Sequence, residues 1–319
     1  MFRRLLQVRP AMIGLTVLLI ASLFPVISAA ATANATYQEQ DLALVQDGSL
    51  TVATSPDYPP AEFIDPEAEG ADSFTGYDMD LARELASRLG LEFNPQQASF
   101  DTIITDLTGP PLGQQRADIA ISSFTINAER QERVNMIPYF RIGESLLVPS
   151  GNPNGIDSVD DLCGRPVAVQ NGTIELSELQ DANGEGDGTS GQDPVCQDDP
   201  VQILSFDTAD QAILQVINGR ADASYQDDPV TGYYTELNPG QVEVGGITVE
   251  PAPVGIAVRK DNPALETALQ DALAAMMADG TYLEILDRWG VTSGACGDAE
   301  CTTGPGGTPV ASPQASPAS

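Results

Sequence analysis

Strand and helix patterns alternate along the first half of the chain, and this alternation restricts the fold more than any other feature. The apolar run at 50–54 predicts a strand, and Leu81, Leu85 and Leu89 at helical spacing predict a helix over 79–90. A strand at 91–95, a helix at 100–107 and a strand at 117–123 follow. Repeated strand–helix–strand units of this kind predict an α/β fold with a parallel or mixed sheet covered on both faces.

The segment DIAISSFTINAER, residues 118–130, joins a strand end to groups that suit a carboxylate. Hydroxyl residues including Ser123 and Thr125 follow the apolar strand, Asn127 can cap the next helix, and Arg130 falls in its first turn. Free backbone N–H groups, hydroxyls and a guanidinium are therefore expected to converge at the strand end, where ligands of α/β sheets usually bind. Taken alone, the segment is equally compatible with a surface arginine after a serine-rich turn.

The second half repeats the theme. Strands are predicted at 144–151 and 166–170, a helix opened by Thr173 follows, and a strand, helix and strand occupy 201–228. GRADASYQDD at 219–228 echoes QRADIAISS at 115–123, which indicates two related halves. A strand at 252–262 and two helices that break at Asp279–Gly280 complete the ordered part.

Both ends of the chain are expected to lie outside the globular part. Residues 1–35 combine three arginines, an apolar stretch at 13–27 and small residues at 28–35, which predicts a secretory signal peptide. The Gly/Pro/Ser-rich tail at 302–319 is predicted to be disordered. The net charge of −32 argues against nucleic-acid and anionic-membrane partners and fits an extracytoplasmic protein.

Cysteine and histidine usage restricts the chemistry further. Four cysteines in an exported chain predict disulfides, and the pairs Cys163–Cys196 and Cys296–Cys301 are favoured because each lies within one local region. The chain has no histidine, so triad catalysis and histidine-ligated zinc are excluded. We expect no metal and no cofactor.

One loop shows partial calcium-site spacing. Residues 181–192 place acidic and amide side chains at alternate positions, but Gln192 replaces the closing glutamate. A flexible acidic loop is the expected structure. The sequence TGPPLG at 108–113 is expected to form a surface loop.

Several motifs, taken in order, resemble one protein family. They are TVATSPDYPPAEF with Tyr58, GYDMDLARELASRLG at 76–90, Phe100–Asp101, the 118–130 segment, VAVQNGT at 167–173, YQDD at 225–228 and the closing VGIAVRKDN…DGTY…RWG. The chain resembles the family 3 extracellular solute-binding proteins, the polar amino-acid receptors of ABC importers. The resemblance implies a periplasmic-binding-protein type II fold with two lobes, two crossing hinge strands and a cleft between them. Lobe 1 would span 45–146 plus 252–292 and lobe 2 would span 147–251.

The resemblance also implies a binding site for a free amino acid. Arg130 would bind the ligand α-carboxylate with help from Thr125, and Gly172 and Thr173 would form a second carboxylate-binding turn. Asp227 would pair with the α-ammonium, which Ser123 would also contact. Taken alone, this aspartate is equally compatible with a turn residue before Pro229, but together with Arg130 the binding role is favoured. Tyr58 and Phe100 would cover the ligand side chain, unless they are ordinary core residues.

Departures from the family pattern leave specificity open. Ser55 stands where receptors for basic or amide side chains often carry aspartate, and Ile174 stands where some members are polar, so a less acidic pocket is expected. The implied partner is an ABC transporter permease, the expected state is a monomer, and the expected location is the periplasm or cell surface. The alternatives are an enzyme resembling cyclohexadienyl dehydratase, for which Glu144 and Glu175 are candidate general acids, and an amino-acid sensor.

Overall fold

The computed structural model describes residues 42–109 and 116–297. The expected signal peptide, the tail, Cys301 and most of the expected loop at 108–113 lie outside these residues.

The strands of the described chain form two sheets. The order of the eight-stranded sheet is β5 (Glu92–Gln97), β1 (Ser49–Thr54), β6 (Ile119–Ala120), β11 (Val242–Arg259), β7 (Val134–Pro149), β10 (Ala223–Asp227), β8 (Pro166–Gln170) and β9 (Gln202–Phe206). The three-stranded sheet consists of β2 (Asp57–Tyr58), β3 (Glu62–Ile64) and β4 (Phe74–Thr75).

The helices connect these strands. They are α1 (Tyr77–Arg88), α2 (Ile103–Thr108), α3 (Ala128–Arg133), α4 (Ile174–Ala182), α5 (Ala209–Ile217), α6 (Asp228–Leu237), α7 (Pro263–Asp279) and α8 (Thr281–Arg288). Short 3-10 turns are η2 (Gly70–Ser73), η3 (Val159–Leu162) and η4 (Thr292–Gly294).

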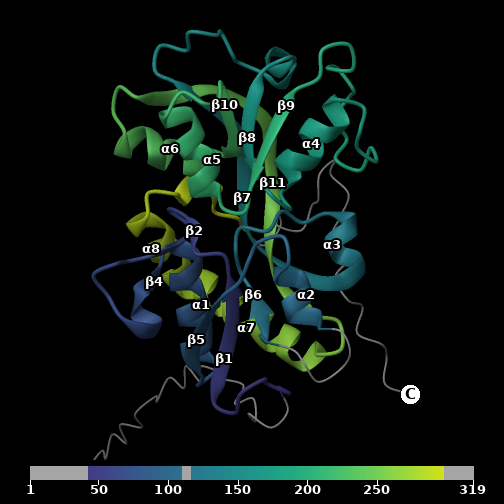
Figure 1. Ribbon diagram of the computed structural model, residues 1–319. Helices are drawn as coiled ribbons and strands as arrows, with labels where there is room; N and C mark the ends of the chain where they lie inside the picture. The colour runs from purple at the N-terminus through teal and green to yellow at the C-terminus, as the bar shows by residue number, and fades with distance from the viewer. Residues whose placement is uncertain (1–41, 110–115, 298–319) are drawn as a thin grey trace, which may run out of the picture. The chain divides into compact units, whose positions relative to one another are not determined.

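Two long strands divide the sheet into two lobes. Strands β7 and β11 pair with each other along their length and run from one group of elements to the other (Figure 1). Lobe 1 holds the parallel strands β5, β1 and β6 beside β11, and lobe 2 holds the parallel strands β9, β8 and β10 beside β7. The mixed α/β sheet with two crossing strands confirms the predicted fold class. The lobe boundaries expected from sequence fall inside β7 and β11 and stay a prediction.

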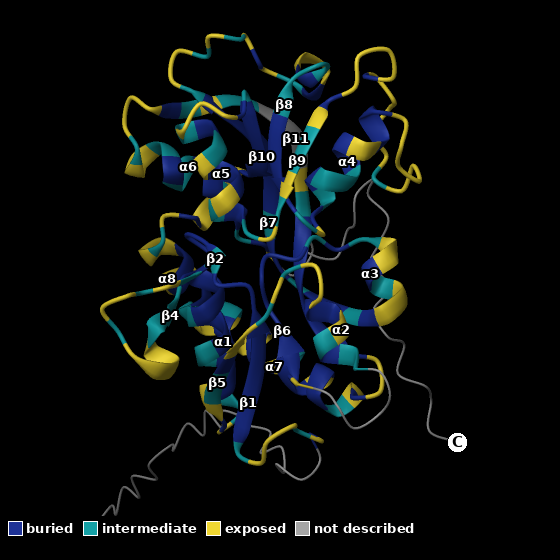
Figure 2. Cartoon of the chain, in the orientation of Figure 1, coloured by how far each residue is buried: buried dark blue, intermediate teal, exposed yellow. Residues whose placement is uncertain are grey.

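Helices cover both faces of the sheet, as the alternating pattern requires. In β1, Leu50 and Val52 pack into the same core as the apolar face of α1, whereas Ala53 faces the core of α2. Successive side chains of a strand point to opposite faces, so a run that is buried throughout indicates a doubly covered strand. Inner strands such as β1 and β10 are accordingly buried in Figure 2, whereas the edge strands β5 and β9 are largely intermediate or exposed, as are the outer faces of the helices.

Three strands differ from the expected lengths. The strand predicted at 117–123 is only the two-residue β6, Ile119–Ala120. The strand predicted at 144–151 starts at Val134, and the strand predicted at 252–262 starts at Val242, because these are the strands that cross between lobes. Register shifts interrupt the β11–β7 pairing between Ile247 and Ala252, near the passage from one lobe to the other. None of the helices in the described part of the chain combines the length and apolarity needed to cross a membrane.

The disulfide and the acidic loop belong to lobe 2. Cys163 and Cys196 are bonded, as predicted, while the expected Cys296–Cys301 pair lies partly outside the described residues and stays a prediction. In the 181–192 loop, the Asp181 carboxylate accepts hydrogen bonds from Gly188 N (2.9 Å) and Ser190 N (3.2 Å). The side chain of Asp181 therefore binds the start of the loop to its later residues.

Candidate functional site

Arg130 is a buried cation held by backbone carbonyls. Asn127 caps α3 by accepting a hydrogen bond from the Arg130 N–H, as predicted. The guanidinium donates to the Thr125 carbonyl (2.8 Å) and, across to lobe 2, to the Gly172 carbonyl (3.1 Å). Its centre lies 5.1 Å from the ring centroid of Phe124 and 5.6 Å from that of Phe100. These contacts orient the guanidinium before any ligand arrives.

The electrostatic setting of Arg130 is unusual for a buried charge. Its exposed fraction is 8%, and within the described ranges no carboxylate lies within 4.0 Å of its nitrogens. Burial lowers the pKa of Arg130 to about 10, because desolvation outweighs the more distant negative charges of Glu175, Glu129 and Asp227. A buried cation with no close counterion is costly, so an anionic ligand group would be stabilising here.

The strand end at Ser122–Ser123 is anchored from behind by two carboxyl groups. Ser122 Oγ donates to Glu62 (2.6 Å), and the Ser123 N–H donates to Asp78 (2.9 Å). Ser123 has a left-handed backbone conformation with φ of 50°. The sequence-based expectation that free N–H groups converge here is therefore wrong for Ser123, because Asp78 from α1 already occupies that donor.

The two carboxyl groups behind the turn are close enough to shift each other's pKa. Glu62 and Asp78 are both fully buried, and Tyr139 donates a hydrogen bond to Asp78 (2.5 Å). Burial and the charge of Asp78 raise the pKa of Glu62 well above its ordinary value, and burial raises the pKa of Asp78 to about 6. Two carboxylates in contact cannot both ionise, so Glu62 is neutral beside ionised Asp78 at neutral pH.

In lobe 2 a tight turn carries Gly172 and Thr173 into α4. The Thr173 hydroxyl caps α4 by accepting from Leu176 N (3.2 Å) and donates to the Gln170 carbonyl (2.9 Å). Gly172 has φ of +77°, and a Cβ atom there would lie 2.7 Å from Asp101 Cα in lobe 1. Only glycine allows this close approach of the two lobes.

Asp227 ends β10 and begins α6, a helix that the sequence pattern did not reveal. Its backbone N–H donates to the Tyr58 hydroxyl (3.2 Å), which links the lobes a second time. Burial raises the pKa of Asp227 well above its ordinary value, and the negative charges of Glu175 and Glu144 raise it further. The missed signal is Pro229 near the start of α6, a preferred position for proline at a helix start.

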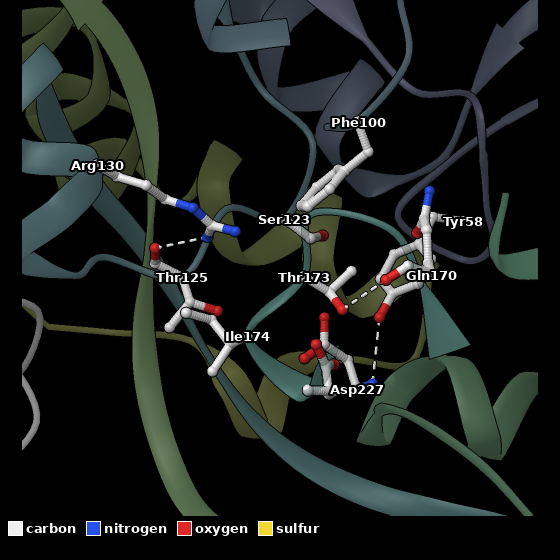
Figure 3. A pocket seen from close by; sticks show the side chains of 10 residues that line it. Tyr58, Phe100, Ser123, Thr125, Arg130, Gln170, Thr173, Ile174 and Asp227 are labelled. Carbon is white, nitrogen blue, oxygen red and sulfur yellow. Dashed lines mark hydrogen bonds between the residues drawn. The ribbon is translucent and has the colours of Figure 1, made fainter. Parts of the chain in front are cut away.

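These groups meet in one pocket between the lobes (Figure 3). Lobe 1 contributes Tyr58, Phe100, Ser123, Thr125 and Arg130, and lobe 2 contributes Gln170, Thr173, Ile174, Glu175 and Asp227. Seven of the eight predicted binding residues line this pocket, and the eighth, Gly172, contacts it through the carbonyl bonded to Arg130. Arg130 and Asp227 reach the space between them from different sides. Their roles in binding stay a prediction.

Gln170 and Glu175 are pocket residues that the site prediction omitted. Gln170 ends β8, and Glu175 lies in the first turn of α4, two residues after the capping Thr173. This spacing could have identified Glu175 from the sequence, because a side chain in the first turn of a helix lies close to the residue that caps it. Burial raises the pKa of Glu175 to about 8, with Glu144 adding to the shift.

The fold and pocket define a class: a two-lobed binding protein in which each lobe supplies part of one enclosed site. The family model of the bacterial extracellular solute-binding proteins, family 3, matches residues 50–292. The chain belongs to this family, which confirms the resemblance drawn from its motifs and places it among extracytoplasmic proteins.

Relatives agree with this placement. The chain is 34% identical to the arginine-binding protein ArgT of Corynebacterium glutamicum over 257 residues, 81% of this chain and 79% of that protein. An ancestral arginine-binding protein bound to arginine is 34% identical, with a TM-score of 0.65, covering 76% of this chain and 98% of that one. The ancestral amino-acid-binding protein AncCDT-1, a precursor of cyclohexadienyl dehydratase, is 34% identical, with a TM-score of 0.61 over 76% and 95% of the two chains.

Proposed function

We propose that this protein captures a free amino acid with a cationic side chain, arginine foremost, and delivers it to an ABC transporter permease. The observation that carries the proposal is the placement of Arg130 and Asp227 in one pocket, on different lobes and without an ion pair between them. A zwitterion matches this pair, because its carboxylate and ammonium can neutralise both groups at once.

The α-carboxylate would bind Arg130. Two of the five guanidinium N–H donors go to the Thr125 and Gly172 carbonyls, which leaves donors for a carboxylate. The hydroxyl of Thr173 is occupied by its capping bonds, so its contribution would come through the backbone of the turn. A charge-assisted pair in this desolvated setting would offset the cost of burying the guanidinium.

The α-ammonium would bind Asp227, with Ser123 beside it. The ligand side chain would lie between Tyr58 and Phe100, whose ring stacks on Phe124 at 4.7 Å between centroids. Tyr58 is held by the Asp227 N–H, so the aromatic cover and the ammonium site are coupled. Aromatic faces also suit a guanidinium, which supports an arginine ligand.

The pocket charge favours a cationic side chain. Glu175 and Asp227 line it together with the single guanidinium of Arg130. A ligand without a side-chain cation would leave Glu175 protonated, because burial raises its pKa to about 8, whereas a side-chain cation could pair with its carboxylate. The less acidic pocket expected from Ser55 and Ile174 took no account of Glu175. The arginine-binding proteins among the relatives support the same choice.

Lobe closure would trap the ligand. The bonds from Arg130 to Gly172 and from Asp227 to Tyr58 join the lobes beside the pocket, while β7 and β11 connect them covalently. A ligand that bridges the lobes favours the closed arrangement. We expect a monomer, held in the periplasm or at the cell surface, with no nucleic-acid partner.

Catalysis is the second candidate because Glu175 has the raised pKa that a general acid needs and because a dehydratase precursor is among the structural relatives. We propose that the protein is not an enzyme, since Glu175 would instead neutralise the cationic side chain of the ligand. Incubation with prephenate or arogenate should leave both unchanged. Turnover that Glu175→Gln abolishes would favour the enzyme.

A thermal-shift screen against the twenty amino acids tests the proposal. Arginine and lysine are expected to give the largest stabilisation, about 2.7 kcal/mol at a hundredfold excess over Kd. Comparison with glutamine, whose side chain is neutral, and with glutamate, whose side chain is negative, isolates the effect of side-chain charge on stabilisation. The proposal would be contradicted if glutamate gave the largest stabilisation or if no amino acid stabilised the protein.

A further inference from the structure

Behind the ammonium site, two acidic residues face each other across neighbouring strands. Asp227 in β10 pairs directly with Glu144 in β7, so both side chains project from the same face of the sheet. Each has an exposed fraction of only 6%. Like charges directly opposite each other on a buried sheet face are destabilising if both are ionised.

A chain of carboxyl groups extends from this pair. Glu178 in α4 is close enough to Glu144 for the two groups to shift each other's pKa, and Tyr225, two residues before Asp227 on the same strand face, donates its hydroxyl to Glu178. Glu175 lies one helical turn before Glu178 and lines the pocket. Because buried carboxyl groups this close together cannot all be ionised, the four residues Glu144, Glu175, Glu178 and Asp227 hold at least one proton.

The neighbouring charges do not remove the need for that proton. Arg130 from α3 supplies the facing positive charge, and Tyr58 from β2 is neutral. Asp181 in α4 and Asp228 in α6 add negative charge to the same surroundings. The balance stays acidic, with four carboxyl groups facing one guanidinium.

We propose that an incoming cationic amino acid displaces a proton from these four carboxyl groups, and that Glu144, which lies outside the pocket lining, controls this exchange. The proposal rests on the proposed function, since the ligand must place its ammonium at Asp227. The cation takes over the stabilising role that the proton has in the free protein. Glu144 acts as a positioning residue through Asp227 rather than by touching the ligand.

The pKa values give the direction of the linkage. Burial, reinforced by neighbouring acids, raises the pKa of Glu144 and of Glu175 to about 8. A bound cation lowers these values, so binding releases a proton wherever the free protein holds one. Affinity for a cationic ligand should therefore increase as pH rises toward about 8, by up to tenfold per pH unit for one proton, and level off above.

Isothermal titration calorimetry with L-arginine tests the proposal. At about pH 7, the binding enthalpy should depend on the ionisation enthalpy of the buffer, with a slope that corresponds to about one proton released. Glu144→Gln keeps the size of the side chain and a donor toward Glu178 but carries no titratable proton. Its proton release should fall well below that of the wild type, and its affinity should depend less on pH.

Glu236→Gln, an exposed substitution in α6, the helix that Asp227 precedes, is the matched control and should behave as the wild type. Arginine binding with the same heat in every buffer and one Kd from about pH 6 to about pH 9 would overturn the proton exchange and leave the proposed function intact. Proton release by Glu144→Gln equal to that of the wild type would overturn the role of Glu144. If neither arginine nor lysine gives heat in any buffer, both proposals fall. The wild-type measurement decides the exchange even if the variant does not fold.

Discussion

Replacing Arg130 with alanine removes the group proposed to bind the ligand carboxylate. The guanidinium is 8% exposed, makes two bonds to carbonyls and lies over two aromatic rings. Loss of one partner of such a desolvated charge pair costs about 2–5 kcal/mol, which corresponds to roughly 30-fold to 4,000-fold in Kd. Loss of the bond to Gly172 between the lobes adds about 0.5–1.5 kcal/mol against closure.

Arg130→Lys separates charge from geometry. Lysine keeps the positive charge but cannot hold two carbonyls and grip a carboxylate with a planar fork, so an intermediate loss of affinity is expected. Arg133→Ala on the same helix is the control, because Arg133 is exposed and bonds only to Thr105 among the described residues. Calorimetry with L-arginine measures Kd, and thermal unfolding without ligand confirms the fold. A folded Arg130→Ala protein with unchanged Kd would refute the assignment.

Three further substitutions test the surrounding structure. Gly172→Ala would place a Cβ atom 2.7 Å from the backbone of lobe 1 and should weaken ligand binding strongly. Gly188→Ala is the control, because Gly188 has a similar positive φ but a Cβ there would meet no atom within 4 Å. Equal Kd values of the two variants in calorimetry would mean that the close approach of the lobes does not contribute to binding. The pKa of Glu62 is raised in the folded protein, so the folded protein keeps a proton that the unfolded chain loses above about pH 4.3. The wild type therefore loses stability as pH rises above that value, and Glu62→Gln does not. The variant should gain stability relative to the wild type by up to about 1.4 kcal/mol per pH unit. Urea unfolding at several pH values measures this difference, and a difference that shrinks as pH rises would exclude a protonated Glu62 in the folded protein. Cys163→Ser opens the loop closed by a disulfide of sequence separation 33 and should lower the unfolding free energy by about 3–4 kcal/mol, whereas an unchanged urea midpoint would show that the bond does not stabilise the fold.

Local pattern predicted most of the fold because the main elements carry local signals. The helix pair that breaks at Gly280 is observed as α7 and α8, with Gly280 in the left-handed conformation at φ of 91°. Thr173 caps α4 and Asn127 caps α3, as their sequence context predicts. The lengths of β7 and β11 were not predictable in this way, because a strand that crosses between two lobes changes its burial pattern along its length and is defined by its partner.

The candidate site was likewise predictable only where its residues carry a local signal. Residue types identified the pocket lining well, since charged, hydroxyl and aromatic side chains at strand ends are a local feature. The direction of the Ser123 N–H depends on Asp78, which is 45 residues away, and no short-range pattern connects them. The acidity in and around the pocket also depends on tertiary structure. The pairing of β7 with β10 places Glu144 opposite Asp227, and the start of α4 places Glu175 in the pocket lining.

The echo between the two halves of the sequence explains how one site obtains opposite charges. Strand β6 lies next to β11 in lobe 1, and β10 lies next to β7 in lobe 2, so each occupies the equivalent place beside a crossing strand. A helix follows each of them, with Arg130 in the first turn of α3 and Asp227 at the cap of α6. Since the carboxyl ends of both strands meet at the cleft, a repeated strand–helix unit delivers a cation from one lobe and an anion from the other. A ligand with one charge would neutralise the charged group of only one lobe, whereas an amino acid bound as proposed would neutralise both, which would favour closure of the lobes around it.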